Sequence, residues 1–219
     1  MTMTTPIRSV LRALALLVVA ALVAPVTFAS EPVLNRDFAM LRPAQPPDTP
    51  GRIEVIEFFS WGCPHCATLH PQLTKWLPTL PKDAVFKRVP VGFGRSSWEA
   101  LARAYYALEA TGDLARLDAA MYQAIHERNL PLADEASIAG WLAKQGVDRA
   151  AFSSAYNSFG VGNKVARAEE MTRRYRISAV PTFTVAGRYA VIAHSEEQIL
   201  ATTSQLVGRA RKENAAALN

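Results

Sequence analysis

Cysteine is scarce in this chain: its 219 residues include only Cys63 and Cys66. A secreted protein that depends on disulfides for stability usually spreads its cysteines, because closing a long loop removes more unfolded-state entropy. Cysteines three positions apart gain little in this way, and a chain of this size buries enough core without a crosslink. The scarcity therefore argues against a purely structural crosslink and leaves a redox pair or a metal site.

A second cysteine pair is absent, and its absence counts against a metal site. Structural zinc normally takes four convergent ligands, often from two separated pairs. His65 lies between the two cysteines and His70 follows them, but residues 65 and 66 would point in different directions on a helix. We therefore expect no metal and no external cofactor. Ordinary surface or packed roles are expected for His70, His126 and His194.

Two further absences narrow the class of protein. No run of Lys and Arg interleaved with aromatic residues occurs, so nucleic acid binding has little support although the formal net charge is +5. No internal repeat or long low-complexity stretch is apparent. Half of the residues are hydrophobic and a fifth are charged, which is ordinary for a globular protein. Disorder is therefore expected only near the ends.

The apolar run near the N-terminus is too short for a bilayer-spanning helix, which needs about 20 residues. This run, LALLVVAALVA, covers residues 14–24; Arg8 and Arg12 precede it, and the sequence TFA that ends at Ala29 resembles a cleavage site. We expect residues 1–29 to be a signal peptide cleaved after Ala29, rather than a membrane anchor. Export places the cysteines in an oxidising compartment.

The remaining chain shows strand patterns at both ends and helical patterns between them. Strands are predicted near 38–41, over 52–60 and over 84–91, and the period-two pattern of 177–192 predicts a hairpin that turns at Ala186 and Gly187. Helices are predicted from Pro64 onward, over 97–111, 113–127, 134–144, 148–157 and 161–174, and after Ser195.

This order predicts an α/β protein in which a helical domain interrupts a sheet-containing domain. Residues 30–95 and 176–219 are expected to form the sheet-containing domain, and residues 96–175 the helical insert. A separate apolar core is expected within the insert, formed by Tyr105, Tyr106, Leu108, Leu117, Met121, Ile125, Trp141 and Phe152.

The position of Cys63, where a strand ends and a helix begins, favours its ionised form. The first N–H groups of a helix lack internal acceptors, and the helix dipole places partial positive charge there. Pro64 suits the first helical turn, where its missing N–H costs nothing. His65 can add a donor or a positive charge beside the sulfur. We therefore expect Cys63 to have a lowered pKa and to be the sulfur that reacts with other thiols.

Cys66 lies one helical turn further on, close enough for its sulfur to bond with that of Cys63. Its thiol is expected to be more buried and less ionised, so that Cys66 resolves a mixed disulfide formed at Cys63. Stabilising the Cys63 thiolate stabilises the reduced protein, and such a protein gives its disulfide away readily. The motif therefore predicts an oxidant of other thiols.

These motifs resemble those of the DsbA family of periplasmic thiol–disulfide oxidoreductases. The shared features are CPHC after EFFSWG, a glutamate six residues before Cys63, a helical insertion, and Val180-Pro181 before the last hairpin. The resemblance runs from about Phe38 to the final helix. It implies a thioredoxin-like fold, in which helices flank a central mixed sheet and an all-helical domain is inserted.

The resemblance also implies a substrate site next to the cysteines. Pro181 is expected to be cis and to face the pair, although an ordinary trans proline is equally consistent with the sequence alone. Val180 is expected to offer its backbone groups to an extended substrate peptide. We expect His65 and Trp61 to contribute to the same substrate surface.

Glu57 resembles the buried acid that the family places beneath the cysteines. A buried carboxylate needs a partner, and this one is expected to relay a proton to or from Cys66. An exposed place at a wet sheet edge is the alternative for Glu57. Lys87 is its expected cation partner, with Arg88 as the alternative, because the two point to opposite faces and the register is unknown.

We therefore expect a monomeric periplasmic oxidase that donates a Cys63–Cys66 disulfide to unfolded, exported, cysteine-containing proteins. By resemblance, its reoxidation falls to a quinone-linked membrane protein of the DsbB type. A dimeric isomerase would carry an extra N-terminal domain, whereas only about 20 residues precede the first strong strand after the cleavage site. A reductant would more often lack His65. A peptide-binding chaperone with incidental thiols is the alternative that would survive alkylation of the cysteines.

Overall fold

A computed structural model describes residues 31–193 and 195–216, so the expected signal peptide and its cleavage site lie outside the described residues. The elements are β1 (Phe38–Met40), β2 (Ile53–Phe59), α2 (Pro64–Trp76), η1 (Leu77–Thr79), β3 (Ala84–Pro90), α3 (Ser96–Thr111), α4 (Leu114–Tyr122), η2 (Gln123–Glu127), α5 (Glu135–Lys144), α6 (Arg149–Tyr156), α7 (Phe159–Arg174), β4 (Thr182–Val185), β5 (Tyr189–Val191) and α8 (Glu196–Ala216).

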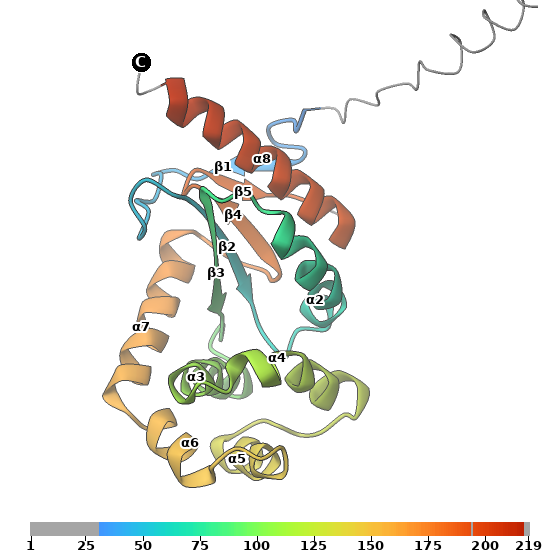
Figure 1. The fold of residues 1–219 in the computed structure, drawn as a ribbon, viewed down its shortest axis with the longest axis vertical. Helices are drawn as coiled ribbons and strands as arrows, with labels where there is room; N and C mark the ends of the chain where they lie inside the picture. Colours follow the sequence, from blue (N-terminus) through green and yellow to red (C-terminus); the bar gives the residue numbers. More distant parts are fainter. Residues whose placement is uncertain (1–30, 194, 217–219) are drawn as a thin grey trace, which may run out of the picture. The chain divides into compact units, whose positions relative to one another are not determined.

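Five strands form one mixed sheet in the order β1-β5-β4-β2-β3 (Figure 1). Strand β2 pairs in parallel with β3 and antiparallel with β4, and β5 is antiparallel to both β4 and β1. All seven residues of β2 are buried, which agrees with its nearly continuous run of β-branched and aromatic residues. Strand β2 lies inside the sheet, between β4 and β3, and its C-terminal end leads directly to the turn that carries the cysteines.

Successive side chains of β2 point to opposite faces of the sheet, and each face has its own helical cover. On one face Val55 packs with Leu69 of α2 and Leu206 of α8. On the other face Ile56 packs with Ala168 of α7. Figure 1 shows α2 and α8 together on one side of the sheet and α7 on the other.

Helices α3–α6 and the π-helical turn η2 gather beyond the ends of β2 and β3 (Figure 1). Their buried side chains form a core that includes Leu108, Met121 and Phe152. The same cluster also contains Cys63 and Cys66. The helices between β3 and β4 therefore form part of the packing around the cysteines, in addition to packing against one another.

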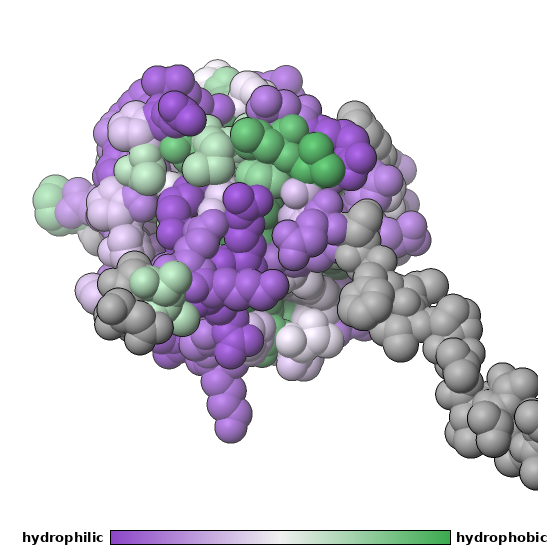
Figure 2. Space-filling model, turned by 90° about the horizontal axis from the view of Figure 1, so that it is seen from above, coloured by the Kyte–Doolittle hydropathy of each residue, from purple (hydrophilic) through white to green (hydrophobic). Residues whose placement is uncertain are grey.

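The surface seen from the α8 end is largely hydrophilic, with hydrophobic residues in separate areas (Figure 2). Among the described residues, no helix combines the length and the apolar character that crossing a bilayer requires.

The β4–β5 hairpin turns at Ala186 and Gly187, as predicted, with φ values of +53° and +62°. Positive φ at both central residues is typical of a type I′ turn, whose backbone twist matches that of the flanking strands. Gly187 also accepts a hydrogen bond from the Gln45 N–H through its carbonyl, at 2.8 Å. A Cβ at position 187 would lie 2.0 Å from the Gln45 carbonyl oxygen, so glycine is required there for space as well as for conformation.

Gly187→Ala is therefore expected to lower the free energy of unfolding by about 3 kcal/mol or more, because the positive φ and the overlap with Gln45 act together. Gly112 is a matched control, since its φ is +81° but a Cβ there would meet nothing within 4 Å. Gly112→Ala should cost only about 1 kcal/mol. Urea denaturation of both variants measures the difference, and equal losses would contradict the close approach at Gly187.

Candidate active site

A short turn connects β2 to α2 and places Cys63 at the N-cap of the helix. The Cys63 N–H donates to the Ser60 carbonyl at 3.1 Å, and the Gly62 N–H donates to the Ser60 hydroxyl, also at 3.1 Å. Pro64 occupies the first helical position, where its missing N–H leaves no bond unmade. The sulfur of Cys63 is therefore directed to the end of the helix at which backbone N–H groups are free.

The two thiols are unbonded and buried, and they differ in acidity. The pKa of Cys63 is lowered to about 6, mainly because the Cys66 thiol donates to its sulfur, against an opposing effect of burial. The N–H groups of Cys66 and His65 and the charge of His65 lower it further. The pKa of Cys66 is raised by the same hydrogen bond, by burial and by the nearby charges of Cys63 and Glu57. Cys63 is therefore the more acidic of the two thiols and Cys66 the less acidic, in the order that the sequence predicted.

The loop before β4 faces the cysteines. The Val180–Pro181 peptide bond is cis, which confirms the expectation for Pro181. The Cys63 sulfur lies 3.4 Å from the Val180 carbonyl oxygen, to which it can donate only when it is protonated. Val180 and Pro181 are partly exposed, and His65 is exposed at the start of α2. The backbone next to Pro181 is thus within reach of a molecule that approaches Cys63.

Glu57 is buried, with 1% of its surface exposed, so the alternative of a wet sheet edge does not hold. Its partner is Arg88, whose Nε donates to the Glu57 carboxylate at 2.6 Å. The prediction of Lys87 was wrong, because the parallel register places Glu57 opposite Arg88 and Ile56 opposite Lys87. Lys87 projects to the other face, where its Nζ bonds the Glu54 carboxylate and lies 3.7 Å from Asp48.

Arg88 also binds two side chains of the helical insert. Its Nη1 donates to Asp118 at 2.7 Å and its Nη2 donates to the Tyr122 hydroxyl at 2.9 Å. The guanidinium lies 3.7 Å from the centre of the Phe59 ring, a cation–π contact. A planar guanidinium can satisfy several acceptors at once, which an ammonium cannot do in the same geometry. Arg88 is thus the common partner of the sheet and the insert beneath the cysteines.

The pKa of Glu57 is raised by its burial, an effect that Arg88 opposes and that Asp118 and Cys63 reinforce. One cation is shared between two carboxylates, and the Cys63 thiolate adds a further negative charge nearby. A carboxyl group in this environment takes up a proton more readily than a solvated one. Glu57 is therefore suited to exchange protons with a neighbouring thiol.

Trp61 is buried, with 1% of its surface exposed, so its expected place on the substrate surface was wrong. Its ring packs edge-on against Tyr105 at 5.5 Å between ring centres, and its Nε1–H donates to Asp118 at 2.8 Å. An aromatic residue beside the motif is turned inward because the insert supplies both an apolar surface and an acceptor for the indole N–H.

Trp98 of α3 occupies the surface next to this turn. A Cβ at position 62 would lie 2.5 Å from the Trp98 Nε1, so Gly62 lies directly against the indole. The Arg95 guanidinium lies 4.6 Å from the Trp98 ring. Sequence reasoning gave no role to Trp98, because nothing in its spacing shows that α3 returns to the cysteines.

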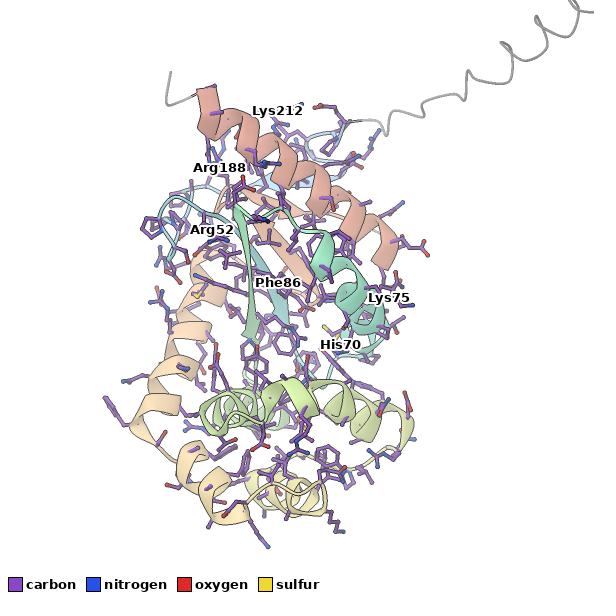
Figure 3. All side chains as sticks on the ribbon, viewed as in Figure 1. Arg52, His70, Lys75, Phe86, Arg188 and Lys212 are labelled. Carbon is purple, nitrogen blue, oxygen red and sulfur yellow. The ribbon has the colours of Figure 1, made fainter. Side chains whose placement is uncertain are left out.

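His70 and His126 are packed against Tyr122, which agrees with the surface or packed roles that the sequence suggested. His70 of α2 points toward α4 (Figure 3), with its Nε2 3.7 Å from Asp118 and its Nδ1 buried without a hydrogen bond. Burial lowers the pKa of His70. His126 donates to the Trp61 carbonyl at 2.7 Å. His194 lies outside the described residues.

A groove of about 350 Å³ lies between α2 and the insert, next to the first turn of α2. It is lined by residues that include Pro64, Ala67, Tyr122 and His126. Within residues 31–193 and 195–216, no three His, Cys, Asp or Glu side chains are grouped so that they could hold a metal ion.

Comparison with known proteins agrees with this geometry. The family described as DSBA-like thioredoxin domain matches residues 77–204. The thiol:disulfide interchange protein DsbA of Bordetella parapertussis is 37% identical over 203 residues, which cover 90% of this chain and 96% of the relative. The protein of the same name from Pseudomonas syringae pv. tomato is 35% identical over 205 residues, covering 90% and 95%.

Solved structures give the same result. The oxidoreductase DsbA from Xylella fastidiosa superimposes with a TM-score of 0.79 at 34% identity, covering 84% of this chain and 100% of that one. DsbA of Pseudomonas aeruginosa gives a TM-score of 0.77 at 34% identity, covering 84% and 95%. The thioredoxin-like fold predicted from the sequence is confirmed.

Arg88→Met is expected to lower the free energy of unfolding by about 3–5 kcal/mol, because Glu57 and Asp118 lose their shared buried cation. Lys87→Met on the same strand is the matched control. It should cost less, about 1–2 kcal/mol, since Glu54 keeps the hydrogen bond from the Thr49 N–H. Urea denaturation of the two variants measures the contrast; a larger loss for Lys87→Met would show that Arg88 is not the central cation.

Proposed function

The chain belongs to the DsbA family of thioredoxin-like thiol:disulfide oxidoreductases, and we propose that it donates a Cys63–Cys66 disulfide through a mixed disulfide at Cys63. Proteins of this family form disulfide bonds in the periplasm, and this chain is an enzyme of that kind. The observation that carries the proposal is the opposite perturbation of the two thiols, with the pKa of Cys63 lowered to about 6 and that of Cys66 raised.

The reaction starts from the disulfide form. A substrate thiolate attacks the Cys63 sulfur, a substrate–Cys63 disulfide forms, and Cys66 leaves with the electron pair of the broken bond. The second substrate thiolate attacks the substrate sulfur of this mixed disulfide, and Cys63 leaves as a thiolate. The substrate loses two electrons and two protons, and the enzyme becomes a dithiol. Cys63 is a good leaving group because its pKa is low.

A proton must reach Cys66 during the first step, because its raised pKa makes it a thiol at neutral pH. Glu57 is buried beneath the pair, and its own pKa is raised. We assign it the relay of a proton between Cys66 and solvent. Arg88 is the hydrogen-bonded partner of this buried carboxyl group.

The substrate peptide binds beside Pro181. The cis bond leaves the Val180 carbonyl 3.4 Å from the Cys63 sulfur, so an extended chain that pairs with the Val180 backbone passes over Cys63. His65 is exposed at the same place and contributes to the binding surface. Because backbone pairing does not depend on side chains, this mode suits unfolded exported proteins of many sequences.

The equilibrium favours donation of the disulfide, since the thiolate form of Cys63 is stabilised in the reduced protein. The redox equivalents are carried by the protein, so the reaction itself requires no cofactor. We propose that a quinone-linked membrane protein of the DsbB type reoxidises the dithiol. We further propose that the protein acts as a monomer and that it reaches the periplasm after cleavage of its signal peptide at Ala29.

Alkylation of the dithiol protein by iodoacetamide should have a pH midpoint near 6, whereas an ordinary cysteine has one near about 8.5. The ionised Cys63 stabilises the folded dithiol form at pH values above the ordinary cysteine pKa. This contribution to the free energy of unfolding is lost as the pH falls through about 6. Cys66→Ala removes the main cause of the shift, so its midpoint should rise. A midpoint near 8.5 in the unmodified protein would overturn the assignment of Cys63.

Cys66→Ser whose Cys63 has first been converted to its mixed disulfide with glutathione should accumulate a disulfide between Cys63 and a reduced, unfolded protein with a single cysteine. The protein thiolate attacks the Cys63 sulfur, glutathione leaves as a thiol, and no resolving thiol remains to release the protein. Cys63→Ser should form none, and both variants should fail to oxidise the substrate. Non-reducing electrophoresis and mass spectrometry identify the linked residue. A Cys63→Ser protein that still oxidised its substrate would contradict the mechanism, and one that only prevented aggregation would favour a chaperone.

A further inference from the structure

Three polar side chains of the insert lie along one side of α4 and η2, at intervals of four residues: Asp118, Tyr122 and His126. Residues four apart lie on the same face of a helix. All three bond to residues of the β2–α2 turn or of β3, rather than to the rest of the insert. This row of side chains is therefore the polar contact between the insert and the catalytic elements.

Asp118 holds the side chain of Trp61. One carboxylate oxygen accepts the indole Nε1–H at 2.8 Å, and the other accepts from Arg88 at 2.7 Å. Trp61 is two residues before Cys63 and fully buried. Its ring can therefore not move without leaving a buried N–H unpaired, which is costly.

His126 holds the backbone of the same residue. Its Nε2 lies 2.7 Å from the Trp61 carbonyl oxygen, which can only accept, so Nε2 carries the proton. The ring stacks on Tyr122 at 6.3 Å between ring centres. His126 lies in a π-helical turn, where the Arg128 N–H bonds the Gln123 carbonyl five residues earlier at 3.0 Å. Such turns are rare and occur frequently at functional sites.

Trp61 is thus fixed at both its ring and its carbonyl by the insert, while Ser60 closes the turn from the other side. The next peptide unit leads through Gly62 to Cys63. The position of Cys63 relative to the free N–H groups of α2 depends on the path of this turn. A thiolate is stabilised by those groups only when the geometry is held.

We propose that Asp118 and His126 are positioning residues, which fix the Trp61–Gly62 turn and so increase the preference of Cys63 for its thiolate form. This inference rests on the proposed function, because it concerns how strongly the same pair acts as an oxidant. It assigns the helical insert a part in setting the redox equilibrium, although no residue of the insert touches the reacting sulfurs through a hydrogen bond among the described residues.

The test compares His126→Leu with His126→Gln, since glutamine can still donate to the Trp61 carbonyl. Each folded variant is equilibrated with reduced and oxidised glutathione, and the Cys63 thiolate is titrated by its ultraviolet absorbance. His126→Leu should shift the equilibrium about threefold to tenfold toward the disulfide and raise the thiolate midpoint, as expected for one lost hydrogen bond. His126→Gln should keep the glutathione equilibrium and the thiolate midpoint close to those of the unmodified protein. Gln123→Leu, an exposed change on the same turn, should leave both values unchanged.

A second pair of variants separates the hydrogen bond that Asp118 accepts from the effect of its negative charge. Asp118→Asn and Asp118→Leu both remove the charge, but only asparagine keeps an acceptor for the indole N–H. Asp118→Leu should therefore be shifted toward the disulfide relative to Asp118→Asn. Asp113→Asn, a surface carboxylate of the same helix region paired with Arg116, is the control and should behave as the unmodified protein.

The outcomes separate the inference from the proposed function. An unmodified protein that fails to oxidise reduced substrate would overturn the proposed function. An active protein whose His126→Leu variant keeps the glutathione equilibrium and thiolate midpoint of the unmodified protein would overturn the inference alone. Equal shifts for His126→Leu and His126→Gln would also overturn it, because the hydrogen bond would then not be the cause.

Discussion

A sulfur anion at the start of α2 is the state on which the rest of this structure depends. It is favoured by a hydrogen bond from Cys66, by free N–H groups of the first helical turn and by the charge of His65. Burial opposes it, and the lowered pKa shows that the favourable interactions are larger. Because the same hydrogen bond raises the pKa of Cys66, one interaction separates the roles of two chemically identical residues.

The buried charged residues next to the cysteines are needed because the two thiols differ in pKa. A resolving thiol that stays protonated needs a proton route, and a carboxyl group in an apolar environment needs a cation. Arg88 meets this need for Glu57 and for Asp118 together, so a residue of the central sheet and one of the insert share a single cation. The two parts of the protein are consequently joined by electrostatics as well as by the apolar core that contains both cysteines.

Much of this could be predicted from the sequence, and the failures have identifiable causes. The strand, the cysteine spacing and Pro64 are local signals, so the reactive pair and the start of α2 were predicted correctly. Lys87 and Arg88 are adjacent and both basic, and only the pairing register of β2 with β3 distinguishes them. Trp61 was placed on the surface because its partners, Asp118 and Tyr105, come from helices more than forty residues away, and no local pattern shows where those helices pack.

Gly62 limits how a protein of this kind can diverge. The indole of Trp98 fills the space that any side chain at position 62 would need. A side chain at the position directly before the reactive sulfur would therefore require the Trp98 ring to shift. Natural or laboratory selection for a stronger or weaker oxidant could act instead on the dipeptide between the cysteines, on the insert, or on positions 62 and 98 together.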